Sequence, residues 1–278
     1  MRVSSLHLYP VKGVRAVDVS SAQVELRGFA GDRRWLVTDD DGMFFTQRTC
    51  PALATIEAAV TAHGLLLVCG ERTCEIVAPQ GDVRHAVQIW EDDVEAAYAG
   101  DDAAQWLSDV LGRPARLYFM DEPAVRTTSE DFCAAAPVSF ADGYPYLLIT
   151  EASLDALNTA IADKGGAAVP MARFRPNMVI EGSDPWADDY WKTVRIGDVV
   201  FDIVKPCVRC EVTTRDQATG ARMGKEPLAT LATLRRSAHA EENGVLFGWN
   251  AIARDKGKIS IGDNVEVLEA RPEGWPLA

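Results

Sequence analysis

The sequence predicts a β-rich α+β fold with barrel-like sheets. Up to about residue 100, short β-prone runs alternate with turn dipeptides, which is typical of a barrel or sandwich rather than of alternating βα units. After residue 143 the chain mixes strands with a few helical patterns. A chain of 278 residues can form two domains of ordinary size. We therefore expect two domains, at about residues 1–120 and 121–270.

The first domain is expected to consist mainly of hairpins. Asp41-Gly42 and His63-Gly64 supply tight turns, because glycine accepts positive φ without steric cost. The expected strands are residues 3–9, 18–26, 34–38, 43–47, 55–61, 65–69, 74–77, 87–90 and 94–98. A helix over residues 101–111, with Asp102 as its cap and Gly112 at its end, closes the domain.

Residues 121–143 show Pro and Gly turn signals with little periodicity, so we expect a linker or a long functional loop there. Thr150 then caps a helix in which Leu154, Leu157 and Ile161 recur at helical spacing. A second helix should run from Pro227 to about residue 236. The remaining expected strands are residues 146–149, 177–181, 193–196, 199–204, 247–253 and 258–268, the last interrupted by a Gly262-Asp263 turn.

Charge and hydropathy exclude several kinds of partner. The 28 Lys and Arg against 41 Asp and Glu give a net charge of −13, which would repel a nucleic-acid backbone. No apolar run approaches the roughly 20 residues of a membrane-spanning helix. The first residues resemble neither a signal peptide nor a transit peptide. We therefore expect a cytoplasmic protein with neither a nucleic-acid nor a membrane partner.

Six cysteines are too few in a chain of this length for a disulfide framework. Cys207 and Cys210 form a C-x-x-C pair between β-prone runs. A zinc site would need two more ligands at suitable spacing, and a thioredoxin-like dithiol would need the pair to open a helix. The residues leave open a thiolate ligand to a bound metal cofactor or two inert cysteines.

A set of cations next to β-prone segments could bind a phosphate or another oxyanion, because guanidinium groups match such oxygens bidentately. These cations are Lys12, Arg33, Arg34, Arg173, Arg175 and Arg209. The alternative for each is an ion pair on a solvated surface. The phosphate-loop, dinucleotide and serine-hydrolase motifs G-x-x-x-x-G-K-[ST], G-x-G-x-x-G and G-x-S-x-G do not occur.

Four motifs together resemble the MOSC family in their order and spacing. They are Tyr9-Pro10-Val11-Lys12-Gly13, Gly31-Asp32-Arg33-Arg34-Trp35-Leu36-Val37, Phe174-Arg175-Pro176-Asn177 and Lys205-Pro206-Cys207-Val208-Arg209-Cys210, the last followed by Thr213-Thr214 and Lys225-Glu226-Pro227-Leu228. The chain is similar to the two-part members, the amidoxime-reducing components and their bacterial relatives. The resemblance implies a MOSC N-terminal β-barrel followed by a MOSC β-barrel domain with a few helices.

The resemblance also implies a molybdenum–molybdopterin cofactor, a pterin whose dithiolene sulfurs hold the metal. The family's metal-ligating and catalytic cysteine falls on Cys210, so Cys207 is a neighbour. The implied cofactor contacts are Lys12, Gly13, Arg33, Arg175, Asn177, Arg209 and Asn250. Gly13 stands where some relatives have Ser, which removes a hydroxyl contact but keeps the backbone N–H. Asn250 stands where a relative has Tyr.

The activity implied by the resemblance is two-electron reduction of small N-hydroxylated compounds such as amidoximes and hydroxylamines. The chain has no dinucleotide fingerprint and no Cys after Cys210, so an electron-transfer protein or reductase should act in trans. The main alternative is a non-catalytic carrier of sulfur or cofactor, in which Cys210 bears a persulfide. A thiol-redox protein using Cys207 and Cys210 is a third interpretation.

Overall fold

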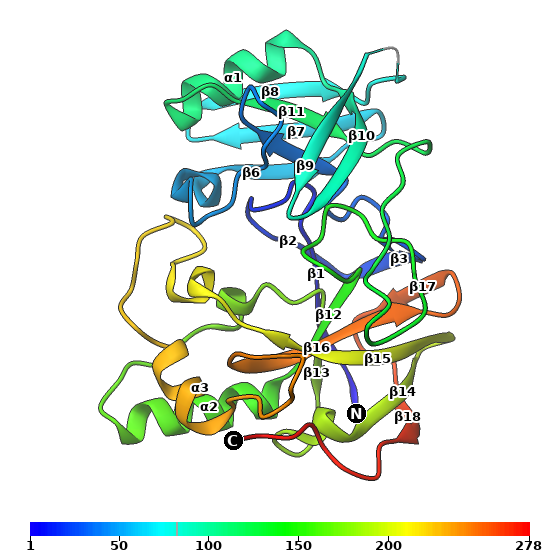
Figure 1. The fold of residues 1–278 in the computed structure, drawn as a ribbon, viewed down its shortest axis with the longest axis vertical. Helices are drawn as coiled ribbons and strands as arrows, with labels where there is room; N and C mark the ends of the chain where they lie inside the picture. Colours follow the sequence, from blue (N-terminus) through cyan, green and yellow to red (C-terminus); the bar gives the residue numbers. More distant parts are fainter. Residues whose placement is uncertain (82) are drawn as a thin grey trace.

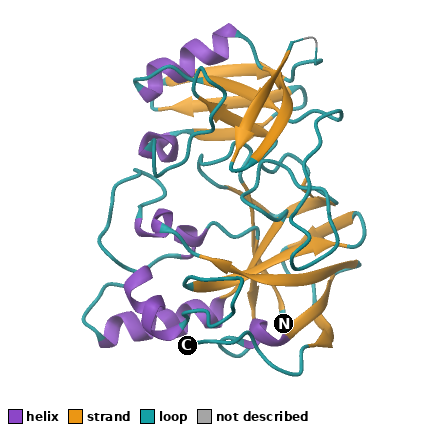
Figure 2. Ribbon diagram, in the orientation of Figure 1, coloured by secondary structure: helices purple, strands orange, loops and turns teal. Residues whose placement is uncertain are grey.

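The computed structural model describes residues 1–81 and 83–278 and has two lobes, one above the other in Figure 1. Strands form the centre of each lobe, and the few helices lie on the outside (Figure 2). The predicted β-rich α+β class is confirmed.

The upper lobe contains two sheets and one α-helix. The first sheet has the order β5-β11-β10-β9 and the second the order β6-β7-β8. Their bounds are β5 Trp35–Thr38, β6 Glu57–Val60, β7 Gly64–Cys69, β8 Arg72–Val77, β9 Arg84–Ile89, β10 Asp92–Tyr98 and β11 Arg116–Phe119. Helix α1, Asp101–Leu111, buries Ala103 and Leu107 in an apolar cluster that also contains Leu65 and Leu117. Gly112 ends α1 in the left-handed conformation, as predicted.

The lower lobe is built on an eight-stranded sheet of order β18-β14-β15-β16-β12-β13-β1-β2. The bounds are β1 Arg2–Leu8, β2 Val17–Val19, β12 Tyr146–Thr150, β13 Met178–Glu181, β14 Trp191–Ile196, β15 Val199–Val208, β16 Leu246–Ala253 and β18 Val265–Ala270. Helices α2, Glu151–Asp163, and α3, Leu228–Leu234, pack beside it. Thr150 caps α2 as predicted, because its side chain accepts a hydrogen bond from the backbone N–H of Ser153.

The first thirty residues pair with the second half of the chain. Strand β1 is antiparallel to β13, and a small sheet of order β17-β3-β4 joins β3, Ser21–Glu25, and β4, Gly28–Phe29, to β17, Gly257–Ser260. The described hydrogen bonding therefore crosses any division of the chain near residue 120. The residue limits given above for the two domains stay a prediction.

Several predicted elements differ in the structure. Residues 43–47 make only isolated bridges, since the Thr46–Thr49 turn interrupts them. Asp102 does not cap α1, because Gly100, at φ 94°, takes the cap position and places Asp102 inside the helix. The β-prone run 211–214 forms a 3₁₀ helix, Glu211–Thr214, instead of a strand. Strands β4 and β11 were not predicted.

Residues 120–145 form a long connection without helix or regular strand, in agreement with the predicted loop. Arg126 holds it together by donating hydrogen bonds to the carbonyl oxygens of Ser139, Ala141 and Asp142. The loop therefore presents residues 141–144 to the space between the lobes. No helix in the part of the chain that the structure describes is long and apolar enough to cross a membrane.

Candidate functional site

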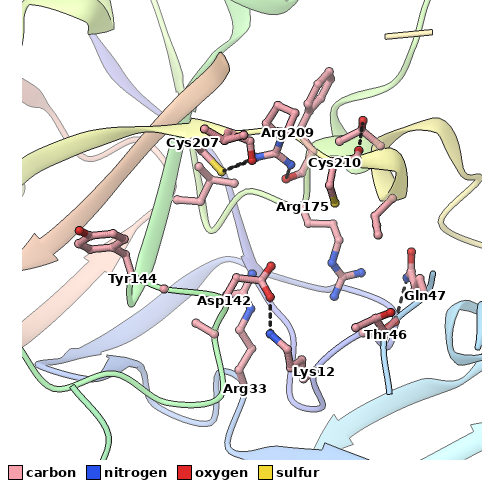
Figure 3. A pocket seen from close by; sticks show the side chains of 18 of the residues that line it. Lys12, Arg33, Thr46, Gln47, Asp142, Tyr144, Arg175, Cys207, Arg209 and Cys210 are labelled. Carbon is pink, nitrogen blue, oxygen red and sulfur yellow. Dashed lines mark hydrogen bonds and ion pairs between the residues drawn. The ribbon is translucent and has the colours of Figure 1, made fainter. Parts of the chain in front are cut away.

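A cavity lies between the lobes, with walls from both of them and from the 120–145 loop (Figure 3). All eight predicted site residues line it: Lys12, Gly13, Arg33, Arg175, Asn177, Arg209, Cys210 and Asn250. The structure thus brings together side chains from four separated motifs. Arg34 and Arg173 do not line it, because Arg34 donates to the carbonyl oxygen of Met120 and Arg173 to that of Thr213.

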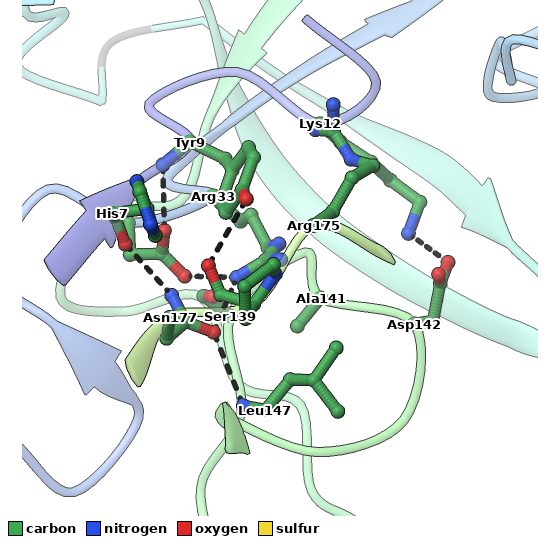
Figure 4. Close-up of polar contacts among 12 residues, drawn as sticks. His7, Tyr9, Lys12, Arg33, Ser139, Ala141, Asp142, Leu147, Arg175 and Asn177 are labelled. Atoms are coloured by element: carbon green, nitrogen blue, oxygen red, sulfur yellow. Dashed lines mark hydrogen bonds and ion pairs between the residues drawn. The ribbon is translucent and has the colours of Figure 1, made fainter. Parts of the chain in front are cut away.

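Lys12 follows β1 and is 7% exposed. Its Nζ lies 2.5 Å from a carboxylate oxygen of Asp142, on the long loop (Figure 4). Burial lowers the pKa of Lys12 to about 8, although Asp142 acts in the opposite direction. Next to it, Gly13 has φ 81°, and a Cβ there would lie 3.0 Å from Leu53. The close packing favours glycine at this position.

Arg33 and Arg175 both contact the ring of Tyr9. Their guanidinium carbons lie 4.5 and 4.2 Å from its centre, and Tyr9 donates a hydrogen bond to the carbonyl oxygen of Pro176 (Figure 4). Both arginines have left-handed backbones, with φ of 48° and 56°. Burial raises the pKa of Tyr9 to about 12, although the two arginines act in the opposite direction. Strained backbones at this point are typical of a functional site.

The side chain of Asn177 connects three other segments of the chain by hydrogen bonds. Its Oδ1 accepts hydrogen bonds from Arg33 and from the backbone N–H of Leu147, while its Nδ2 donates to the carbonyl oxygen of His7. The side chain is completely buried. Arg33 also donates to the buried carboxylate of Asp32, 2.5 Å away. Asn177 and Asp32 therefore fix the direction of the Arg33 guanidinium.

Arg175 is held from both lobes. It donates one hydrogen bond to the carbonyl oxygen of Val14 and another to Oε1 of Gln217, at 2.8 and 3.0 Å. Gln47, Asp142, Trp90 and Gln217 take part in the site or its support, and sequence reasoning missed all four. No local pattern marks them, because their roles arise only when the lobes meet.

The two cysteines have different surroundings. Cys207 lies in β15, where Arg209 donates to its sulfur at 2.9 Å; burial raises the pKa of this thiol, and Arg209 opposes that rise. Cys210 is exposed and precedes the Glu211–Thr214 3₁₀ helix. In Figure 3 its sulfur points into the cavity on the side of Arg175, away from Cys207. Both cysteines line the cavity, and Cys210 is the exposed one of the pair.

The donor set fits a metal that brings its own ligands. Among residues 1–81 and 83–278 no group of three His, Cys, Asp or Glu side chains could hold a metal ion. What the cavity offers is one exposed thiol, five cations and a buried Nε of Arg209 that has no partner within the described chain. A thiolate suits a soft or sulfur-bound metal, and the cations suit an anionic group such as a phosphate. The residues therefore fit a metal–pterin phosphate and not a zinc site.

Comparison with known families agrees with this geometry. Residues 1–114 match the MOSC N-terminal beta barrel domain, and residues 135–266 match the MOSC domain. The chain is a two-part protein of the kind that combines these domains, and it belongs to the MOSC family.

Among similar proteins, the human "Mitochondrial amidoxime-reducing component 1" is 32% identical, over 96% of this chain and 82% of that protein. The rice "Molybdenum cofactor sulfurase" is 28% identical over 96% of this chain, which corresponds to only 35% of that protein. Among solved structures, the YuaD protein of Bacillus subtilis covers 95% of this chain and 93% of its own at 8% identity and a TM-score of 0.40. The two matched domains and the human relative confirm the resemblance to two-part MOSC proteins.

Proposed function

We propose that this chain is a molybdenum-cofactor-dependent oxidoreductase that reduces small N-hydroxylated compounds such as amidoximes and hydroxylamines. One observation carries the proposal: a single exposed thiol, Cys210, opens into a cavity that Lys12, Arg33 and Arg175 also line. The name of the human relative supports the substrate class.

Each residue has a role in this proposal. Cys210 would supply a thiolate ligand to the metal. Lys12, Arg33, Arg175 and Arg209 would hold the pterin and its phosphate. When bound, the cofactor supplies two-electron redox chemistry at molybdenum.

The supporting residues work through these contacts. Gly13 offers a backbone N–H, and Asn177 keeps Arg33 directed by accepting its hydrogen bond. Asn250 donates weakly to the carbonyl oxygen of Pro206, at 3.4 Å, and so lines the cavity next to the C-x-x-C segment. Trp90, Phe45 and Phe174 give the cavity apolar wall area that limits access of water.

Electrons come from a separate electron-transfer protein or reductase. The chain has no dinucleotide fingerprint, so NADH has no recognisable site. Redox partners usually meet over small interfaces, below about 1,200 Å². The net charge of −13 would weaken long-range attraction to an acidic carrier, which would have to find a local basic patch.

The test is to purify the chain from a host that makes molybdenum cofactor and to measure molybdenum, pterin, iron and flavin. Hydroxylamine and an amidoxime are then supplied with NADH alone or with reduced viologen. We expect molybdenum and pterin near one per chain, and turnover with viologen only. Absence of molybdenum and pterin would overturn the cofactor assignment, and turnover with NADH alone would overturn the need for a partner.

A non-catalytic sulfur carrier is the second candidate, because Cys210 is exposed and the rice relative is named a molybdenum cofactor sulfurase. Release of thiocyanate on treatment with cyanide would reveal a persulfide. Two results together would favour this candidate over the reductase: wild-type protein that shows no turnover but releases thiocyanate, and a Cys210→Ser variant that releases none.

A further inference from the structure

Trp90 occupies a backbone position that normally requires glycine. It is the first of two loop residues between β9 and β10, since Ile89 pairs with Asp92 across the turn, and its φ is 55°. Positive φ at this place in a two-residue hairpin is usually supplied by glycine, because a Cβ is strained there. The loop therefore keeps a tryptophan at a cost in backbone free energy.

The location of the strained residues is informative. In the part of the chain that the structure describes, four residues other than glycine have positive φ: Arg33, Trp90, Arg175 and Trp186. The first three line the cavity, and Trp186 does not. The proposed function uses Arg33 and Arg175 as cofactor contacts but treats Trp90 only as part of the apolar wall. Strain held in one cavity by three residues points to binding for all three.

The indole of Trp90 is accessible within this wall. Its exposure is 40%, whereas Phe45 and Phe174, which also line the cavity, are 3% and 0% exposed. The ring of Phe44 packs against it in a T-shaped arrangement, with ring centres 4.9 Å apart. The guanidinium of Arg48 lies 5.1 Å from the ring and Lys12 Nζ lies 5.9 Å from it. A partly exposed aromatic ring is thus held in contact with cations of the site, which lie over it.

We propose that Trp90 is a ligand-binding residue whose indole stacks on the planar ring of the pterin, while neighbouring cations hold its phosphate. This inference rests on the proposed function and names a contact that the motifs do not contain. A planar heterocycle gains free energy by stacking on an aromatic side chain, and Lys12 and Arg48 bring positive charge to the same place.

The test compares three variants of the cofactor-loaded protein. Trp90→Gly removes the ring and relieves the strained backbone, Trp90→Phe keeps a smaller ring, and Trp186→Phe changes the other left-handed tryptophan, outside the cavity. Two quantities are measured: the rate at which pterin is released, from its fluorescence, and the Tm of the cofactor-free protein.

We expect Trp90→Gly to release pterin about tenfold faster, the scale of losing an aromatic stacking partner, while its cofactor-free Tm stays equal or rises. Trp90→Phe should release pterin within a few-fold of the wild-type rate, and Trp186→Phe should leave the release rate unchanged. A wild-type release rate in Trp90→Gly would overturn the inference, and so would faster release accompanied by a lower cofactor-free Tm. A wild-type protein that carries no pterin would instead overturn the proposed function.

Discussion

Gln47 and Gln217 exchange two hydrogen bonds, with the Nε2 of each amide 3.0 Å from the Oε1 of the other. Gln47 also donates to the carbonyl oxygen of Gly13, and Oε1 of Gln217 also accepts from Arg175. Gln47 is 2% exposed, so water competes little for this pair. One amide pair thus ties the loop before residue 50 to the segment after Cys210 and to a cation of the cavity.

Gln217→Ala should therefore loosen Arg175 and lower the occupancy of the pterin without removing any proposed cofactor contact. We expect a loss of about 1–3 kcal/mol in unfolding free energy, because Oε1 of the buried Gln47 loses its donor while its Nε2 keeps the contact with Gly13. Denaturant unfolding and pterin content measure the two effects. Gln217→Glu, which still accepts from Arg175, should retain more pterin than Gln217→Ala.

A double-mutant cycle with Gln47→Ala gives the control. If the pair acts as a unit, the two single changes should cost more in sum than the double variant. Strict additivity would show that the two amides contribute independently, contrary to the structure.

Cys210→Ser should abolish turnover, whereas Cys207→Ser should only weaken it, because the exposed Cys210 is the proposed metal ligand and Cys207 accepts a hydrogen bond from Arg209. Rates with reduced viologen are compared after normalising to molybdenum content. Equal losses at matching molybdenum content would indicate a dithiol mechanism instead.

Arg33→Ala and Arg175→Ala should each lower pterin occupancy, since a phosphate would lose a charge-assisted partner worth a few kcal/mol. The matched control is Arg195→Ala, which removes an arginine from an exposed pair with Glu266 on the surface. Full pterin content and unchanged affinity in both cavity variants would show that these arginines stabilise the protein and do not bind the cofactor.

Stability should depend on pH through Lys12. Its pKa is about 8 in the folded chain and ordinarily 10.5, so between these values the unfolded chain binds more protons. The free energy of unfolding of cofactor-free protein should therefore rise with pH in this window, by roughly 2–4 kcal/mol relative to Lys12→Met.

Denaturant titrations of both proteins from pH 7 to 10.5 measure this difference. Bound pterin phosphate would favour the charged lysine, so the rise should shrink in loaded protein. Parallel curves for wild type and Lys12→Met in the cofactor-free state would contradict the effect of burial on Lys12.

The elements that sequence reasoning placed correctly depend on local chemistry. Thr150 caps α2 through a hydrogen bond to Ser153, three residues away, and Gly112 ends α1 by its own φ. The prediction of Asp102 as the cap of α1 was wrong. Whether Asp102 or Gly100 caps the helix depends on the direction in which the chain enters α1. Strand β11 was missed because its four residues gain stability from pairing with β5 and β10, far away in the sequence.

The candidate site shows the same limit. The motifs identify Arg33 and Arg175 one by one, but their shared contact with the ring of Tyr9 depends on long-range packing. Asn177 belongs to a predicted motif, but the motif does not show that its amide links Arg33, Leu147 and His7 by hydrogen bonds. No sequence pattern marks Gln217 or Trp90. Gln217 acts through its contacts with Gln47 and Arg175, and Trp90 through its place in the cavity wall, and both depend on distant segments.

The pairing of the first strands with late ones sets an order for synthesis on the ribosome. Arg2 pairs with Glu181, and Ser21 pairs with Ser260, so β1 and β3 emerge long before their partners exist. At ordinary elongation rates the gap for β3 is on the order of ten seconds or more. The upper-lobe strands β5 to β11 find one another first. The nascent chain meanwhile carries unpaired strand edges at its beginning, where a chaperone would have its longest opportunity to bind.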